Sequence, residues 1–143
     1  MRAFALGLIL SALLLAGCGG EPGPTVQRLV GSSPGLLEVS SWSLDGQRDG
    51  ARTRAIARLQ LASGEELRVE LHLAYNPSPV LEQGSWSTAD DGGSVNAERV
   101  RFVGGQGEGP SVGGDYVLVD ARNLPRYRVQ LPLTPISRPA PRP

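Results

Sequence analysis

The segment from Leu67 to Tyr75, LRVELHLAY, alternates apolar and polar side chains with a strict period of two. The apolar positions are Leu67, Val69, Leu71, Leu73 and Tyr75, and the intervening ones are Arg68, Glu70, His72 and Ala74. This period places neighbouring side chains on opposite faces of an extended strand. A strand with one apolar face needs a sheet and a core to cover it, so the segment predicts a β-protein.

Other segments support the same class of fold. Arg126 to Leu133 alternates in the same way, and Pro132 predicts that this strand lies at a sheet edge or ends there. Ala51 to Leu61 fits a helix or a strand, and the strand is preferred because a short turn joins it directly to Leu67–Tyr75. Three more strands are expected at Leu36–Leu44, Ser94–Val103 and Asp115–Asp120. In Leu36–Leu44 the apolar residues change parity, which predicts a bulge or burial on both faces.

These strands, with turns rich in Asp-Gly and Gly-Gly pairs, predict an all-β fold. Six to seven strands in residues 35–134 are typical of a single antiparallel β-sandwich, with a small barrel as the alternative. The composition agrees, because the chain has 19 Gly and 12 Pro and only 5% aromatic residues. Cys18 is the only cysteine, so no internal disulfide can form.

The first residues have the features of an export signal. Met1 and Arg2 precede an apolar run from Ala3 to Leu15, which is shorter than the roughly 20 residues needed to span a bilayer. The run ends in Leu15-Ala16-Gly17-Cys18, which resembles the lipobox of bacterial lipoproteins. The resemblance covers only these residues. It implies cleavage after Gly17, a diacylglycerol thioether on Cys18 and, as a rule, acylation of the new amine. A plain signal peptide and an uncleaved anchor are the alternatives.

The chain therefore divides into four predicted parts. Residues 1–17 are a signal peptide, 18–34 a lipidated N-terminus with a Gly/Pro/Ser-rich tether, 35–134 the β-domain and 135–143 a Pro-rich tail. Gly19 and Gly20 stand where enterobacterial lipoproteins retained in the inner membrane carry Asp, so the resemblance favours the outer membrane. The acylated Cys18 makes membrane lipid one predicted partner.

The charge pattern gives no sign of a nucleic-acid partner. All 14 basic residues are Arg, 14 acidic residues balance them, and the Arg are spread along the chain. A neutral chain without a basic block has no field to attract a polyanion. Several Arg and two interleaved acids, Glu70 and Glu98, are expected on outward strand faces, which predicts a solvated face with ion pairs. The Arg are Arg54, Arg58, Arg68, Arg99, Arg101, Arg126 and Arg128.

No recognisable catalytic, cofactor or metal site is found. His72 is the only histidine and lies on a polar strand face, so we expect a solvated side chain. The chain lacks a Gly-x-Ser-x-Gly nucleophile turn, and the glycine-rich loop Gly104–Gly109 lacks the Lys-Ser/Thr of a phosphate loop. Asp90 and Asp91, with Asp115 after another Gly pair, offer oxygen ligands for Ca²⁺, but a plain turn is preferred.

Three large aromatic residues have two possible roles. Trp42, Trp86 and Tyr116 are expected in the core, because a small aromatic-poor domain needs its large side chains there. Exposed, they would form a stacking platform for a sugar or a peptide.

We expect a membrane-anchored lipoprotein whose non-catalytic β-domain binds an envelope protein or glycan through a sheet edge or loops. One alternative is an envelope enzyme with a dispersed pair of carboxylates, and another is a purely structural envelope protein. The candidates for the pair are Asp90, Asp91, Glu98, Glu108 and Asp115. A carboxylate pair clustered in a pocket would favour the enzyme.

Overall fold

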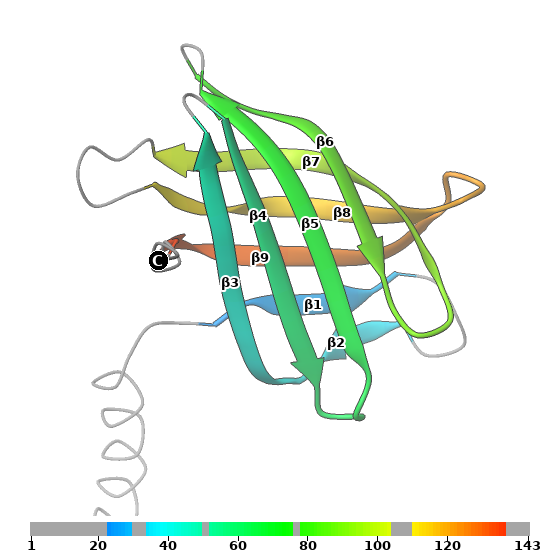
Figure 1. Cartoon of the computed structure of the whole chain (residues 1–143). Coiled ribbons are helices and arrows are strands. Elements are labelled where there is room, and N and C mark those ends of the chain that lie inside the picture. The colour runs from blue at the N-terminus through cyan, green and yellow to red at the C-terminus, as the bar shows by residue number, and fades with distance from the viewer. Residues whose placement is uncertain (1–22, 30–33, 50–51, 76–77, 104–109, 137–143) are drawn as a thin grey trace, which may run out of the picture.

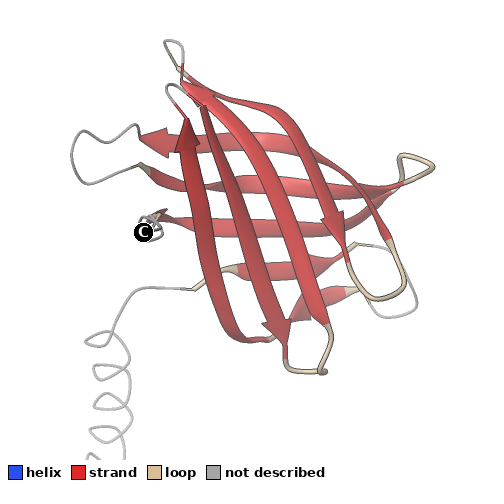
Figure 2. Cartoon of the chain, viewed as in Figure 1, coloured by secondary structure: helices blue, strands red, loops and turns tan. Residues whose placement is uncertain are grey.

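The computed structural model describes residues 23–29, 34–49, 52–75, 78–103 and 110–136. Their regular elements are all strands (Figure 2). The strands are β1 Thr25–Arg28, β2 Gly35–Leu37, β3 Val39–Asp49, β4 Arg52–Leu61, β5 Glu66–Tyr75, β6 Pro79–Ser87, β7 Gly92–Val103, β8 Ser111–Asp120 and β9 Pro125–Pro135. No helix in this part of the chain is long and apolar enough to cross a membrane.

The nine strands form one antiparallel sheet in the order β2-β1-β9-β8-β7-β6-β5-β4-β3. Figure 1 shows the sheet folded over itself, with β3 to β6 crossing over β7, β8, β9, β1 and β2. The end strands β2 and β3 are consecutive in the chain, joined at Glu38. The sheet is thus nearly closed into a barrel. The predicted all-β antiparallel class is confirmed, whereas six to seven strands were too few.

Two strands were not predicted. β1 lies inside the segment predicted as a tether, where Val26 is fully buried and pairs with Val129 and Leu37. The tether prediction is therefore wrong for Thr25–Arg28. β6 shows no clean alternation because the β5–β6 register shifts at Glu82, which changes the face that later residues point to.

The remaining strands overlap the predicted segments, although β3 continues to Asp49 and β8 already begins at Ser111. Ala51–Leu61 corresponds to β4, a strand and not a helix. The parity change in Leu36–Leu44 reflects a break at Glu38 and a register shift between Val39 and Ser41.

The interpretation of Pro132 was wrong, because β9 lies between β1 and β8 and continues to Pro135. The proline is tolerated for two local reasons. Pairing with β1 ends at Gln130, and a register shift with β8 places Pro132 and Leu133 opposite the single residue Gly113. A bulge of this kind leaves a residue outside the regular ladder, where a missing N–H costs little.

The hydrophobic core lies between the two layers of the folded sheet. One layer consists of β3 to β6, and the other of β7, β8, β9, β1 and β2. Its largest fully buried side chains are Tyr116, Leu59, Leu67, Leu71, Leu73 and Leu118. Tyr116 donates its hydroxyl hydrogen to the carbonyl of Gly113 at 2.7 Å, and burial raises the pKa of this phenol. Trp86 is also buried, and Trp42 is partly buried against the core. The prediction that these aromatic residues serve the core is confirmed for Trp86 and Tyr116.

The side chain of Ile136 belongs to the core and packs against β3. A Cβ on Gly46 would lie 2.7 Å from Cγ2 of Ile136, so this glycine of β3 lets the isoleucine pack against the strand. The backbone N–H of Ile136 donates to the carbonyl of Pro110 at 2.9 Å. The predicted tail therefore starts later than residue 135, because Ile136 belongs to the fold. Residues 137–143 lie outside the described residues.

Candidate functional site

β6 and β7 are paired at one end only. Their pairs are Ser85 with Ser94, Trp86 with Gly93 and Ser87 with Gly92. Beyond this short ladder, residues 79–84 pair with β5 alone and residues 95–103 pair with β8 alone, among the residues that the structure describes. Two strand edges therefore face each other with backbone N–H and C=O groups that no neighbouring strand takes up.

Local packing explains why the two strands separate. A Cβ on Gly84 would lie 2.8 Å from the Cβ of Val95, so the side chain of Val95 packs against β6 at a residue that has no side chain of its own. Each strand then carries a register irregularity, at Glu82 in β6 and at Glu98 in β7. Bulges bend a strand and increase its twist, so β6 and β7 curve away from each other.

The space between the two edges, which we call the β6–β7 opening, is a hollow of about 520 Å³. Its lining mixes the apolar side chains of Val80, Leu81 and Val100 with the two bulge carboxylates, Glu82 and Glu98. Both carboxylates are held by arginines that lie two strands away in the sheet. Glu82 lies 3.2 Å from Arg52, and Glu98 accepts two hydrogen bonds from Arg128 at 3.0 and 3.2 Å. The opening thus combines strand edges with polar and apolar contacts.

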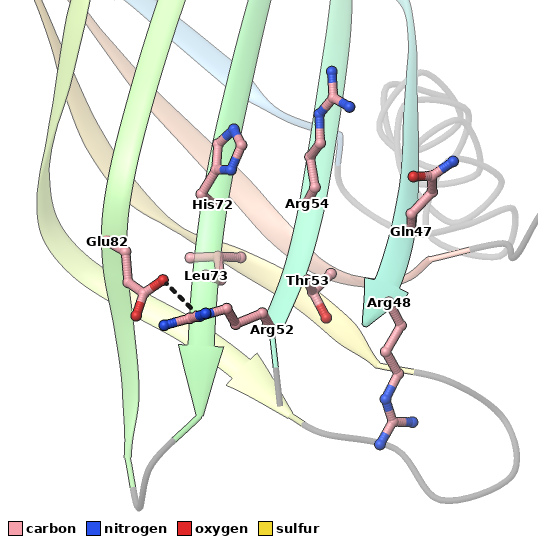
Figure 3. A pocket seen from close by; sticks show the side chains of 8 residues that line it. All are labelled: Gln47, Arg48, Arg52, Thr53, Arg54, His72, Leu73 and Glu82. Atoms are coloured by element: carbon pink, nitrogen blue, oxygen red, sulfur yellow. Dashed lines mark ion pairs between the residues drawn. The ribbon is translucent and has the colours of Figure 1, made fainter. Parts of the chain in front are cut away.

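A second hollow, of about 300 Å³, lies across the ends of β3 to β6 (Figure 3). We call it the arginine pocket. Strand register places Gln47, Arg54 and His72 side by side on β3, β4 and β5. Arg52 lies two residues before Arg54 on β4 and reaches toward Glu82 on β6 (Figure 3).

The carboxylate of Glu70 contacts the basic side chains beside this pocket. Its Oε2 accepts a hydrogen bond from Nε of Arg54 at 2.8 Å and lies 2.9 Å from Nε2 of His72, while Oε1 lies 3.3 Å from Nη2 of Arg68. Burial alone would raise the pKa of Glu70. The hydrogen bonds from His72 and Arg54 and the positive charges of Arg54 and Arg68 outweigh it, so the pKa is lowered. His72 lies on the polar face, half exposed, as predicted, but its carboxylate partner was missed.

Acidification is expected to remove the stabilisation that the ionised Glu70 provides. A folded-state pKa below the usual 4.5 means that this contribution is fully present above about pH 4.5 and is lost as the pH falls through the lowered value. In Glu70→Gln the free energy of unfolding in urea should depend less on pH in this range. Glu66→Gln, an exposed position on the same strand, should keep the wild-type pH dependence. Identical profiles for Glu70→Gln and the wild type would contradict the assignment.

Three of the other outward arginines, Arg58, Arg99 and Arg126, form ion pairs as predicted. Arg58 lies 3.6 Å from Asp45 and Arg99 lies 4.0 Å from Asp115. Arg126 contacts both Asp91 and Asp120, at 2.7 and 3.5 Å. These pairs are largely exposed, so each contributes little to stability.

The Asp90–Asp91 loop is built as a turn. The Thr88 hydroxyl accepts the backbone N–H groups of Asp90 and Asp91, and a carboxylate oxygen of Asp91 accepts the N–H of Gly92. Asp91 also contacts Arg126. Within the described ranges no group of three or more His, Cys, Asp and Glu side chains is placed to hold a metal ion.

Three of the carboxylates considered for an acid/base pair have an arginine partner. Asp91 contacts Arg126, Glu98 contacts Arg128 and Asp115 contacts Arg99. Asp90 is exposed in its turn. Glu108, the loop Gly104–Gly109 and Cys18, the residue predicted to carry lipid, lie outside the described residues.

Comparison with known proteins finds no family model, no curated protein and no solved structure that matches this chain.

Proposed function

We propose that this chain is a lipid-anchored binding protein of the bacterial cell envelope and that its β-domain is not catalytic. The acylated Cys18 holds it to a membrane, and Gly19 and Gly20 favour the outer membrane. Two or three acyl chains provide durable anchoring, at ~0.8 kcal/mol for each buried CH₂ group. The rigid β-domain then presents a binding surface close to the membrane.

The observation that carries this proposal is the β6–β7 opening. Facing strand edges recognise a partner that supplies backbone N–H and C=O groups at the spacing of a strand. An extended protein segment does this along its whole length, and a glycan does not. Val80 and Leu81 on one side and Val100 on the other offer apolar contacts for alternate side chains of such a segment. We therefore infer an envelope protein as the partner, in preference to a glycan.

The ion pairs support a binding role over an enzymatic one. A catalytic carboxylate is usually held at a perturbed pKa, near a second titratable group and a substrate cavity. Here Asp91, Glu98 and Asp115 are instead each matched by an arginine. This arrangement suits a charged surface more than a proton-transfer pair.

The experiment that tests the proposal is chemical crosslinking in intact cells. The tagged full-length chain is solubilised in detergent, captured and analysed by mass spectrometry. A variant that keeps residues 1–22, which precede β1, and lacks the β-domain serves as the anchor-only control. We expect a reproducible envelope protein in the full-length sample that is absent from the control. Identical captures from both would contradict a binding role for the β-domain.

Replacing the lipidation residue should abolish both the attachment of lipid and the cleavage of the signal peptide. In Cys18→Ser the thiol that accepts the diacylglycerol is gone, so the signal peptide should stay uncleaved by the lipoprotein peptidase and no fatty acid should be incorporated. Metabolic labelling with a fatty acid and the mobility of the chain in gels measure both effects. Ser11→Ala, which changes the apolar run and leaves Cys18 in place, is the control. Normal processing of Cys18→Ser would show that the chain is not a lipoprotein.

A further inference from the structure

The chain between the predicted lipid anchor and the barrel is short. Pro24 is buried and β1 begins at Thr25, so the fold includes the chain from this point onward. Gly23 follows Cys18 by five positions. A fully extended chain covers at most about 18 Å over five residues. A bilayer that holds acyl chains on Cys18 therefore lies closer to Gly23 than the width of the barrel, since a domain of about 100 residues has a radius of gyration of about 13 Å.

Strand directions show which end of the barrel is next to this anchor. Thr25, the first residue of β1, pairs with Gln130 of β9, so β1 starts on the side toward which β9 runs. The antiparallel order places the ends of β5, β7 and β9 and the start of β6 at this same end, and the turn between β8 and β9 at the opposite end. Figure 1 shows the start of β1 and the ends of β7 and β9 on one side of the barrel. We call this side the anchor end.

Exposed apolar side chains gather at the anchor end. Among the described residues, the exposed large apolar side chains are Leu36, Tyr75, Val80, Val103, Leu124 and Leu133. Four of these six lie at the anchor end, and one of the four, Val80, lines the β6–β7 opening. The other three, Tyr75, Val103 and Leu133, form what we call the anchor-end rim and are between 39% and 53% exposed. Exposed apolar side chains gathered in one place mark a contact surface.

The chemistry of the anchor-end rim fits the interface between a membrane and water. Tyr75 meets Phe102 edge to face, with 6.1 Å between the ring centroids, and keeps part of its ring exposed. Tyrosine is enriched at membrane interfaces, because its ring is apolar and its hydroxyl is polar. Arg101 lies two residues before Val103 on the same exposed face of β7 and forms no ion pair with any carboxylate in the described part of the chain. Its guanidinium group suits the phosphate of a lipid headgroup.

We propose that the anchor-end rim rests on the lipid bilayer to which Cys18 is attached. This inference rests on the lipid anchor proposed above. The acyl chains bring the rim to the membrane surface, and contact of Tyr75, Val103 and Leu133 with lipid then fixes the orientation of the barrel. The β6–β7 opening starts at the same end, so its partner is met next to the membrane.

The test places a fluorescent probe at either end of the barrel in the mature, lipidated chain. Val103→Cys and Leu124→Cys are each labelled on the new thiol with nitrobenzoxadiazole and reconstituted on vesicles of phosphatidylcholine and phosphatidylglycerol. The two positions are 53% and 48% exposed and lie at opposite ends of the barrel. At Val103 we expect emission at shorter wavelengths and quenching by lipids that carry a nitroxide on the acyl chain. At Leu124 we expect neither change.

Two results would overturn the proposal. Equal quenching at both positions, or at neither, in a chain that sediments with the vesicles would show that the anchor holds the barrel in no fixed orientation. The lipid anchor itself would then still stand. A wild-type chain that reacts with the probe and stays in solution would instead show a free thiol at Cys18, which removes the anchor and the docking together.

Discussion

Gly93→Ala is expected to destabilise the domain by about 3 kcal/mol or more, which is a large share of the stability of a typical domain. Gly93 pairs with Trp86 of β6 and with Asp120 of β8, at the short ladder that joins the two layers. A Cβ there would collide with the carbonyl oxygen of Val119 and lie 2.9 Å from the Cα of Asp120. These are backbone atoms of a paired strand, so they cannot move aside as a flexible side chain does.

Urea unfolding followed by circular dichroism measures this effect. The control is Ser94→Ala, which changes the next residue of the same strand at an exposed position. We expect its free energy of unfolding to stay within about 0.5 kcal/mol of the wild type. A Gly93→Ala variant that unfolds at the wild-type urea concentration would show that β7 and β8 do not approach each other as described.

Trp86→Ala is expected to cost about 3 to 5 kcal/mol of stability. The ring is buried and meets the ring of Tyr127 edge to face, with 5.5 Å between the centroids. Its Nε1–H donates to the carbonyl of Val119 at 2.7 Å. Removing the ring leaves a cavity between the layers and takes away the partner of a backbone carbonyl.

Trp86→Phe separates the two contributions, because it keeps an aromatic ring in the core and loses the hydrogen bond. We expect a loss of about 1 to 3 kcal/mol for this variant, smaller than for alanine. Trp42 remains in both variants and allows unfolding to be followed by fluorescence. Equal and small losses in both variants would contradict the burial of Trp86 at the junction of the layers.

Local sequence patterns predicted the strands that bury one face in the core and expose the other to solvent. β4 and β5 each bury one face along nearly their whole length, so the period of two survives in the sequence. β1 has only four residues with one of them, Val26, fully buried, which is too short for a pattern to emerge from a glycine- and proline-rich segment. β6 changes face at Glu82, so its pattern is interrupted.

The two candidate sites differ in how far the sequence points to them. Part of the arginine pocket could be inferred from the sequence. The predicted hairpin between Ala51–Leu61 and Leu67–Tyr75 sets the register that brings Arg54 opposite His72. The β6–β7 opening depends on the order of strands and on a contact between Gly84 and Val95, which lie on different strands. A glycine within a strand does mark a close approach of another segment. The sequence does not say which segment approaches.

The partner of the opening can be tested at a single residue. A photo-crosslinking amino acid placed at Val80, which lines the opening and is 46% exposed, should form a covalent adduct with an envelope protein in living cells. The same amino acid at Leu124, between β8 and β9 and 48% exposed, is the matched control and should give no such adduct. An adduct at Val80 alone supports a lipoprotein that binds its partner between β6 and β7. Adducts of equal yield at both positions, or at neither, would contradict it.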